Sequence, residues 1–284
     1  MKKEKFTTLS ALNYRNKKRK FSMISVYDFP TAKYAEEAGI NSLLVGDSLA
    51  MTVLGHENTV SITMEEMLHH VKAVSRASKY SMVVADMPFM SYQTSIENAI
   101  INAGRFLKEG NADAVKVEGG CEMAETVKSI FDAGISVVGH IGLTPQSAGK
   151  LGGLKTQGKT LESAKKLLND AISLQQAGAF AILMECIPAK IASVINQQLN
   201  VPTISYGSGP DLDAQGLVAA DVLGLFDLFK PKFSKRFSEL GIEMKSAFNQ
   251  YHEEVIQRKF PSDENVYNVS DSVFEKFLLE IKKN

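Results

Sequence analysis

SLLVGD at residues 42–47 is a short apolar run that ends in a carboxylate, and similar runs recur along the chain. The later runs end in other ionisable residues, namely Asp86, Lys116 with Glu118, His140 and Glu185. If the runs are parallel strands of one barrel, their C-terminal ends share a rim, where barrel enzymes hold their reacting groups. The pattern therefore predicts a metal-assisted active site on that rim.

The rest of the chain alternates short β-branched runs with longer helical periods, which is the pattern of parallel βαβ units. The first run covers residues 23–27, and a helical stretch from Pro30 to Ala38 follows it. The eighth and weakest run is Ala220–Gly224. Eight such units favour an α/β fold with a closed (βα)₈ TIM barrel. A doubly wound open sheet is the alternative, because alternation alone does not separate the two.

The predicted domain organisation is a single barrel domain over residues 1–284. A basic segment occupies about residues 1–20, and a charged, mixed tail occupies about residues 262–284. Within the tail, Val273 to Ile281 has the pattern of a short amphipathic helix.

Composition excludes several function classes. Lys and Arg together number 32, as do Asp and Glu, so no net positive charge points to nucleic acid or an anionic membrane. No run of eighteen apolar residues exists, and we expect a soluble, cytoplasmic protein. The two cysteines, Cys121 and Cys186, have no pairing motif, which argues against a disulfide framework or a zinc site. Cys186 follows Glu185, but we expect it to be buried and inert rather than a nucleophile.

Three carboxylates, those of Asp47, Asp86 and Glu118, end three consecutive runs. Neighbouring strands lie about 4.8 Å apart, so carboxylates at equal heights come close enough to share one ion. Oxygen ligands of this kind suit Mg²⁺. The alternative is that each aspartate caps the helix that follows it.

The remaining charged strand ends have distinct expected roles. Lys116 lies two residues before Glu118, so both side chains point to the same face of their strand, and Lys116 suits either a substrate carboxylate or a structural ion pair. The apolar neighbours of Glu185 would desolvate it and raise its pKa, as suits a general base. His140 is expected to be a hydrogen-bond partner rather than a catalyst.

Six motifs in order resemble the ketopantoate (3-methyl-2-oxobutanoate) hydroxymethyltransferase family, over about residues 5 to 265. They are VGDSLAMTVLGHENTVSITMEEMLHH, ADMPFMSY, VKVEGG, GHIGLTPQS, LMECIP and GPDLDAQGLVAADVLGLF. The resemblance implies an enzyme with a barrel of the phosphoenolpyruvate mutase and isocitrate lyase type, usually assembled as a homodecamer. It implies transfer of a hydroxymethyl group from 5,10-methylenetetrahydrofolate to 3-methyl-2-oxobutanoate, giving 2-dehydropantoate in pantothenate and coenzyme A synthesis.

The resemblance also implies roles for individual residues. Asp47 and Asp86 would ligate Mg²⁺, with Glu118 in or just outside the ligand set. Ser48 would hold the substrate carboxylate, together with Asp47, Asp86 and Lys116 as substrate-binding residues. Glu185 would remove the C3 proton with the cation assisting enolate formation, and His140 would support it.

The chain departs from the family pattern in two places. The family's seventh strand usually reads IGIGAG, whereas residues 204–209 read ISYGSG, with Tyr206 and Ser208 at positions that are normally small or aliphatic. This region lies near the substrate and folate pocket. In FPSDENVY, Asn265 stands where the family commonly has histidine.

Two other functions remain as alternatives to the transferase. One is another Mg²⁺-dependent enzyme that makes or breaks C–C bonds of 2-oxo acids, of the lyase or phosphonopyruvate type, which would need no folate. The other is a catalytically inactive barrel that serves as a binding or assembly module. The complete set of charged strand ends argues against the second alternative.

Overall fold

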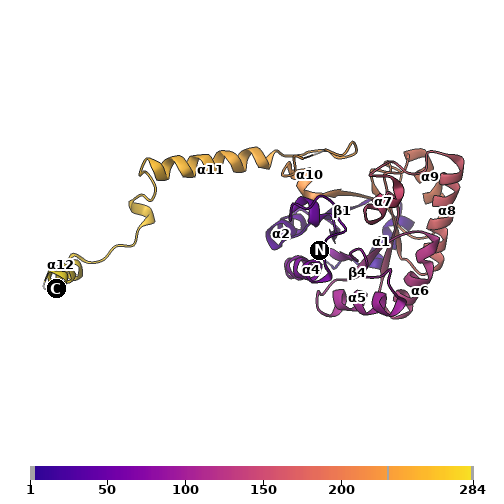
Figure 1. Cartoon of the computed structure of the whole chain (residues 1–284), viewed down its shortest axis with the longest axis horizontal. Helices are drawn as coiled ribbons and strands as arrows, with labels where there is room; N and C mark the ends of the chain where they lie inside the picture. The colour runs from indigo at the N-terminus through magenta and orange to yellow at the C-terminus, as the bar shows by residue number, and fades with distance from the viewer. Residues whose placement is uncertain (1–3, 229, 283–284) are drawn as a thin grey trace. The chain divides into compact units, whose positions relative to one another are not determined.

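Eight parallel strands close into one barrel in the computed structural model, which describes residues 4–228 and 230–282. Figure 1 shows the barrel and the helices around it. The strands follow one another in chain order, and the last pairs with the first. Their bounds are β1 Phe21–Ser25, β2 Ser42–Val45, β3 Met82–Asp86, β4 Ala114–Glu118, β5 Val137–Gly142, β6 Ala181–Glu185, β7 Thr203–Tyr206 and β8 Ala214–Val218. The predicted TIM barrel is therefore confirmed, and the open sheet is excluded.

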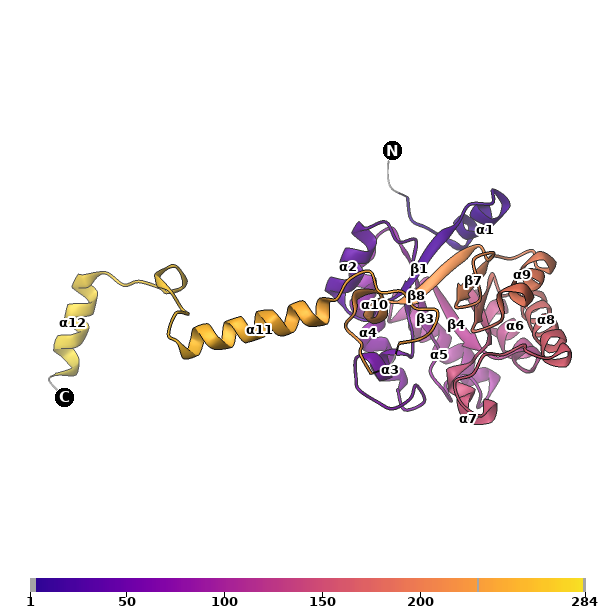
Figure 2. The same ribbon diagram turned by 90° about the horizontal axis from the view of Figure 1, so that it is seen from above.

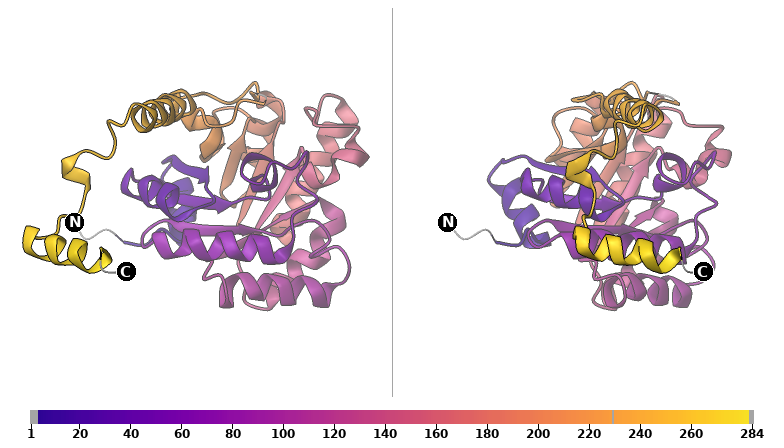
Figure 3. Two further views of the ribbon diagram at one scale, coloured as in Figure 1. Left: turned by 60° about the vertical axis from the view of Figure 1, so that its left-hand side comes forward. Right: turned by 90° about the vertical axis from the view of Figure 1, so that its left-hand side faces the viewer.

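Apart from α1, which precedes β1, the helices of the barrel unit follow strands, and the long ones lie on the outside of the barrel (Figure 3). The α-helices of this part are α1 Thr8–Asn16, α2 Phe29–Glu37, α3 Leu49–Thr52, α4 Met64–Ala77, α5 Ile96–Lys108, α6 Ala124–Asp132, α7 Ala148–Leu151, α8 Leu161–Gln176, α9 Ala189–Gln198 and α10 Ala219–Leu223. Short 3₁₀ turns are η1 Cys121–Met123 and η2 Pro145–Ser147. The sequence sets several of these helix starts locally: at α4, for example, Thr63 and Glu66 form a capping box.

The barrel has two apolar cores, as a closed sheet covered by helices requires. One lies between the strands and the outer helices. The other fills the barrel interior, and it includes Met23, Leu44, Val84, Leu183 and Ile204. Because side chains fill the interior, a ligand of the barrel is expected at one of its ends.

The N-terminal end of the barrel is covered by α1 (Figure 2). Phe6 and Ala11 pack in the same interior cluster as Phe21. Arg15 bonds to Asp213 and, at 2.8 Å, to the backbone oxygen of Asn196. This end is therefore closed by structural contacts, and the opposite end is left for chemistry.

One predicted strand was wrong. Residues Ala220–Gly224 do not form the eighth strand, because α10 covers most of them and β8 lies just before, at Ala214–Val218. The strand was missed because Gln215 and Gly216 give it weak β character. Backbone hydrogen bonds to both β7 and β1 stabilise this strand, although its composition does not predict a strand.

The chain divides into two compact units, Met1–Phe237 and Ser238–Asn284. The second contains α11 Leu240–Ile256, the 3₁₀ turn η3 Asp263–Asn265 and α12 Asp271–Ile281. The helix α12 confirms the expected terminal helix, and the tail boundary at about residue 262 stays a prediction. The assignment of residues 1–284 to a single domain stays a prediction. Among the described helices, none has the length and apolar composition that a membrane span requires.

Candidate active site

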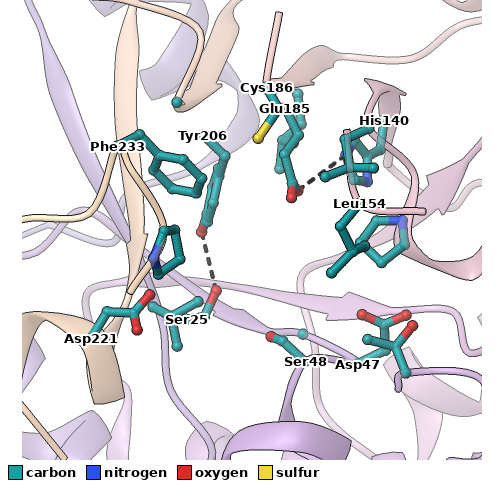
Figure 4. Close-up of a pocket in the computed structure, with 18 of the residues that line it drawn as sticks. Ser25, Asp47, Ser48, His140, Leu154, Glu185, Cys186, Tyr206, Asp221 and Phe233 are labelled. Atoms are coloured by element: carbon teal, nitrogen blue, oxygen red, sulfur yellow. Dashed lines mark hydrogen bonds and ion pairs between the residues drawn. The ribbon is translucent and has the colours of Figure 1, made fainter. Parts of the chain in front are cut away.

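A cavity of ≈ 680 Å³ lies at the C-terminal ends of the strands (Figure 4). All the side chains that the sequence predicts as site residues line it: Asp47, Ser48, Asp86, Lys116, Glu118, His140 and Glu185. The structure therefore brings the predicted set together, at the end of the barrel where the strand-end rule places it.

Strand register places the charged groups of β3, β4 and β5 beside one another. Asp86 pairs with Lys116, and Glu118 pairs with His140. Nζ of Lys116 lies 2.9 Å from Oδ1 of Asp86, 3.4 Å from Oε1 of Glu118 and 3.1 Å from Nδ1 of His140. Lys116 and Glu118 share a face, as their spacing predicts.

Asp47 joins this cluster from the turn after β2. Its backbone N–H donates to Oδ2 of Asp86 at 3.1 Å, and its Oδ2 accepts from Nε2 of Gln146 at 3.0 Å. The helix that follows, α3, receives no side-chain cap. The capping alternative is therefore wrong for Asp47, whose carboxylate faces the cavity.

The buried cluster contains more carboxylates than nearby cations, and this excess shifts the pKa values of its members. Burial raises the pKa of Asp47 well above its usual range, and repulsion from Asp86 and Glu118 adds to this. Burial likewise raises the pKa of Asp86, although Lys116 opposes it. For Glu118, burial is outweighed by attraction to Lys116 and contact with His140, so its pKa is lowered. Because of its carboxylate neighbours, Lys116 keeps a raised pKa despite burial.

This donor set fits a hard divalent cation. Three carboxylates face one ammonium and the imidazole of His140, and all five groups are at most 5 % exposed. Unpaired negative charge is costly away from water, so a cation with oxygen ligands would relieve the repulsion that raises the pKa of Asp47. Asp47, Asp86 and Glu118 would be the residues to hold it.

His140 connects the carboxylate cluster to Glu185. Its Nδ1 lies 3.4 Å from Oε1 of Glu118, and its Nε2 lies 3.4 Å from Oε2 of Glu185 (Figure 4). Burial and the charge of Lys116 disfavour protonation, but contacts with Glu118 and Glu185 prevail and raise the pKa of His140 to about 9. The imidazole therefore sits between two acids as a linking group.

Glu185 ends β6 apart from the other acids, and its side chain is 19 % exposed. The backbone around it is tightly held, since Leu143 N–H donates to its carbonyl at 2.8 Å. A side chain on Gly142 could not fit there, because its Cβ would lie 2.2 Å from that same oxygen. The backbone of Glu185 is thus fixed, and its side chain lines the cavity.

Cys186 follows Glu185 with a backbone φ of 51°, in the left-handed region. Burial, with a further contribution from Glu185, raises the pKa of its thiol to about 12. A thiol with a raised pKa is a poor nucleophile, in line with the expected inertness. The expected burial is wrong, because Cys186 is only partly buried and lines the cavity. The turn is held by Ser208, whose hydroxyl donates to Met184 O at 2.8 Å and accepts from Ile187 N–H at 3.0 Å.

Three polar residues near the site were not singled out from the sequence. Gln146 bonds Asp47 through its side chain, and its backbone N–H donates to Oε2 of Glu118 at 3.1 Å. The Tyr92 hydroxyl lies 2.7 Å from Oε1 of Gln146, and the Tyr27 hydroxyl lies 2.8 Å from Oγ of Ser48. Gln146 and Tyr92 stand inside two of the quoted motifs, which was the available signal.

A second group of possible ligand atoms lies outside the lining of the cavity. Atoms of Cys121, Glu122 and Asp170 come within 4.8 Å of one another. The Asp170 oxygens already accept from Cys121 Sγ at 2.8 Å and from Lys166 Nζ at 2.6 Å. These contacts satisfy the Asp170 carboxylate without a metal ion, and we interpret the group as structural.

Comparison with known proteins gives a consistent result. Residues 5–263 match the family model described as ketopantoate hydroxymethyltransferase. A 3-methyl-2-oxobutanoate hydroxymethyltransferase of Carboxydothermus hydrogenoformans is 54% identical over 273 residues, covering 96% of this chain and 99% of that protein. The enzyme of the same name from Acetivibrio thermocellus is 50% identical, with 96% of each chain covered.

Solved structures agree on the fold. A phosphonopyruvate hydrolase crystallised with oxalate and Mg²⁺ has a TM-score of 0.59 and 12% identity, covering 98% of this chain and 97% of that one. A 2,3-dimethylmalate lyase of the PEP mutase and isocitrate lyase superfamily also has a TM-score of 0.59, with 15% identity and 98% of both chains covered. The barrel therefore has the architecture of that superfamily.

Proposed function

The chain belongs to the ketopantoate hydroxymethyltransferase family, and from that membership we propose that it converts 3-methyl-2-oxobutanoate to 2-dehydropantoate in pantothenate biosynthesis. The hydroxymethyl group would come from 5,10-methylenetetrahydrofolate. The observation that supports this most is a single cavity that holds an acidic cluster suited to a cation and, apart from it, the carboxylate of Glu185.

Binding of the 2-oxo acid would use the polar side of the cavity. Ser48, whose hydroxyl lies 2.8 Å from that of Tyr27, would donate to the substrate carboxylate. The ammonium of Lys116 would balance the added negative charge. Both groups line the cavity, so no rearrangement of the barrel is required.

Asp47 and Asp86 would hold Mg²⁺, with Glu118 as a third ligand or a close neighbour. When bound there, the cation supplies Lewis-acid polarisation of the keto group, which makes the C3 proton of the substrate more acidic. Gln146 keeps Asp47 oriented toward this position through its 3.0 Å hydrogen bond.

Glu185 would then act as the general base. Its carboxylate takes the C3 proton, and the electron pair left on C3 forms the new bond to the one-carbon unit of the folate. Both bonds between the methylene carbon and the folate nitrogens would break, and one water molecule would supply the hydroxyl group. The remaining proton of that water and the proton taken from C3 would go to the two nitrogens, which leaves 2-dehydropantoate and tetrahydrofolate. His140, 3.4 Å from Oε2, would orient Glu185.

The direct experiment measures formation of 2-dehydropantoate by the purified protein with and without methylenetetrahydrofolate, and with and without Mg²⁺. The proposal expects turnover only when both are present. Turnover of 2-oxo acids that needs no folate would instead support a lyase or phosphonopyruvate-type enzyme. A purified protein with neither activity nor metal affinity would support the alternative of a catalytically inactive binding module.

We also propose that the protein works as a homo-oligomer, a homodecamer in keeping with the family resemblance. The support within the chain is the surface of α11, where large apolar side chains are exposed and none of the described residues of the helix is buried. Exposed apolar surface of this extent is characteristic of an interface.

A further inference from the structure

Tyr206 lines the cavity, and Gly216 on the neighbouring strand leaves room for its ring. A Cβ on Gly216 of β8 would lie 2.0 Å from Cε2 and 2.4 Å from Cζ of the Tyr206 ring. The ring therefore occupies the space that a side chain at position 216 would fill. Large and small residues on neighbouring strands are paired here.

The Tyr206 ring has a fixed position. Its hydroxyl lies 3.1 Å from Oγ of Ser25 on β1, and both residues are buried, at 5% and 1% exposure. The ring also belongs to the barrel-interior cluster that contains Leu44 and Leu183. With one end tied to Ser25 and the other on its strand, the ring is a rigid part of the cavity floor.

Tyr206 lies next to the proposed base. It pairs in register with Glu185, and Figure 4 shows both side chains on the same side of the cavity, with the phenol reaching toward Ser25. Ser48 and Asp47 lie across the cavity from Glu185 in that view. A 2-oxo acid held by its carboxylate near Ser48, with C3 at Glu185, would place its C3 substituents against the Tyr206 ring.

We propose that Tyr206, tied to Ser25 and accommodated by Gly216, is a specificity-determining residue that limits the size of the alkyl groups on C3 of the 2-oxo acid. The inference rests on the function proposed above. The aromatic face would pack against the two methyl groups at C3, and a ring held in place by Ser25 would not move aside for a longer chain. One extra methylene in such a pocket is typically worth about 10- to 200-fold in kcat/KM.

The test compares 3-methyl-2-oxobutanoate with 3-methyl-2-oxopentanoate, which has one more methylene at C3. Exchange of the C3 proton in deuterated water with Mg²⁺ is followed by NMR for each acid, and kcat and KM are taken separately. In Tyr206→Ile we expect the kcat/KM ratio to shift toward the larger acid by about 10-fold or more, mainly through KM. Tyr206→Phe keeps the ring but loses the tie to Ser25, so a smaller shift in the same direction is expected.

Two further variants separate local shape from general loosening. Tyr206→Ile combined with Gly216→Val refills the space from β8 and should return the ratio toward that of the wild type. Ile204→Val removes a methylene deeper in the interior, at a residue that does not line the cavity, and should leave the ratio unchanged.

The outcomes distinguish failure of the Tyr206 inference from failure of the proposed transferase function. Wild-type protein that exchanges 3-methyl-2-oxobutanoate, with an unchanged ratio in both Tyr206 variants, would overturn the inference alone. An equal shift in Ile204→Val would overturn it too, because the effect would then be general. Wild-type protein with no exchange would overturn both.

Discussion

At the scale of single residues, Lys116 compensates part of the negative charge of the carboxylate cluster. Its ammonium is within 3.4 Å of two carboxylates and within 3.1 Å of His140, and its side chain is 4% exposed. Removing one partner of such a buried group leaves an uncompensated charge, which costs several kcal/mol. Lys116 therefore holds the acidic strand ends together, and any binding role is added to that structural one.

Glu185 is the residue on which the proposed proton transfer depends. Glu185→Gln should slow C3 proton exchange of 3-methyl-2-oxobutanoate by about 10²- to 10⁴-fold, because an amide is not a base. Exchange into deuterated water is followed by NMR. Glu125→Gln, the same change at an exposed position on α6, should have no effect. Exchange at the wild-type rate in Glu185→Gln would rule out Glu185 as the base.

Gln146 positions a proposed metal ligand without being one itself. Gln146→Leu removes the donor to Asp47, and metal affinity should fall about 10- to 100-fold, the usual effect of losing such a supporting contact. Calorimetric titration with Mg²⁺ or Mn²⁺ measures this. Asp86→Asn, which removes a proposed ligand, should weaken binding at least as much, and Gln198→Leu on the exposed face of α9 should not. Unchanged titrations in the first two variants would place the cation elsewhere.

At the scale of elements, α2 is fastened to the loop before β3 by one carboxylate. Glu36, 7% exposed, accepts from the backbone N–H groups of Lys79, Tyr80 and Ser81 and from the Ser78 hydroxyl, at 2.8 to 3.0 Å. Burial alone would raise the pKa of Glu36, but these donors outweigh it and hold the pKa below its ordinary 4.5.

The contact of Glu36 makes stability depend on pH. A lowered folded-state pKa gives stability that is complete above about pH 4.5 and is lost as the pH falls through the folded-state value. Glu36→Gln should lower the free energy of unfolding by about 1–3 kcal/mol at pH 7, because the amide leaves buried donors unsatisfied.

Urea denaturation of both proteins across pH checks the Glu36 prediction. The difference between wild type and Glu36→Gln should shrink below pH 4.5. Glu37→Gln is the matched control. Glu37 is exposed, and its carboxylate lies 3.8 Å from Nζ of Lys33 in a surface ion pair that contributes little to stability. A difference that stays constant with pH would contradict the proposed role of the charge.

At the scale of the whole molecule, α11 carries an exposed apolar surface of the kind that forms interfaces. Met244, Phe248, Tyr251 and Val255 recur at helical spacing and are 40% to 66% exposed. We define them as the α11 stripe. A second copy of the chain is the proposed cover, and burial of the stripe would stabilise the assembly.

Light scattering coupled to gel filtration tests the assembly. We expect the wild type to run as a homo-oligomer and Phe248→Glu to reduce its mass, because a charge in an apolar interface is not compensated. Ser246→Glu adds the same charge on the opposite face of α11 and should keep the wild-type mass. A monomeric wild type, or equal behaviour of the two variants, would show that the stripe is not the interface.

The sequence by itself determined the barrel, and it singled out residues that line one cavity. Strand-end residues such as Asp47, Asp86 and Glu185 could be placed on a common rim because parallel strands point their C-terminal ends the same way. The spacing of Lys116 and Glu118 fixed their common face, since side chains alternate along a strand. Local patterns suffice for such features.

Only the tertiary structure decided which groups touch. The eighth strand is Ala214–Val218 because barrel closure supplies its partners, and Gln146 reaches Asp47 across 99 positions of the chain. The fit of the Tyr206 ring over Gly216, with its hydroxyl at Ser25, joins three strands. Contacts of this kind depend on register and on the volumes of residues distant in sequence, and no local pattern encodes them.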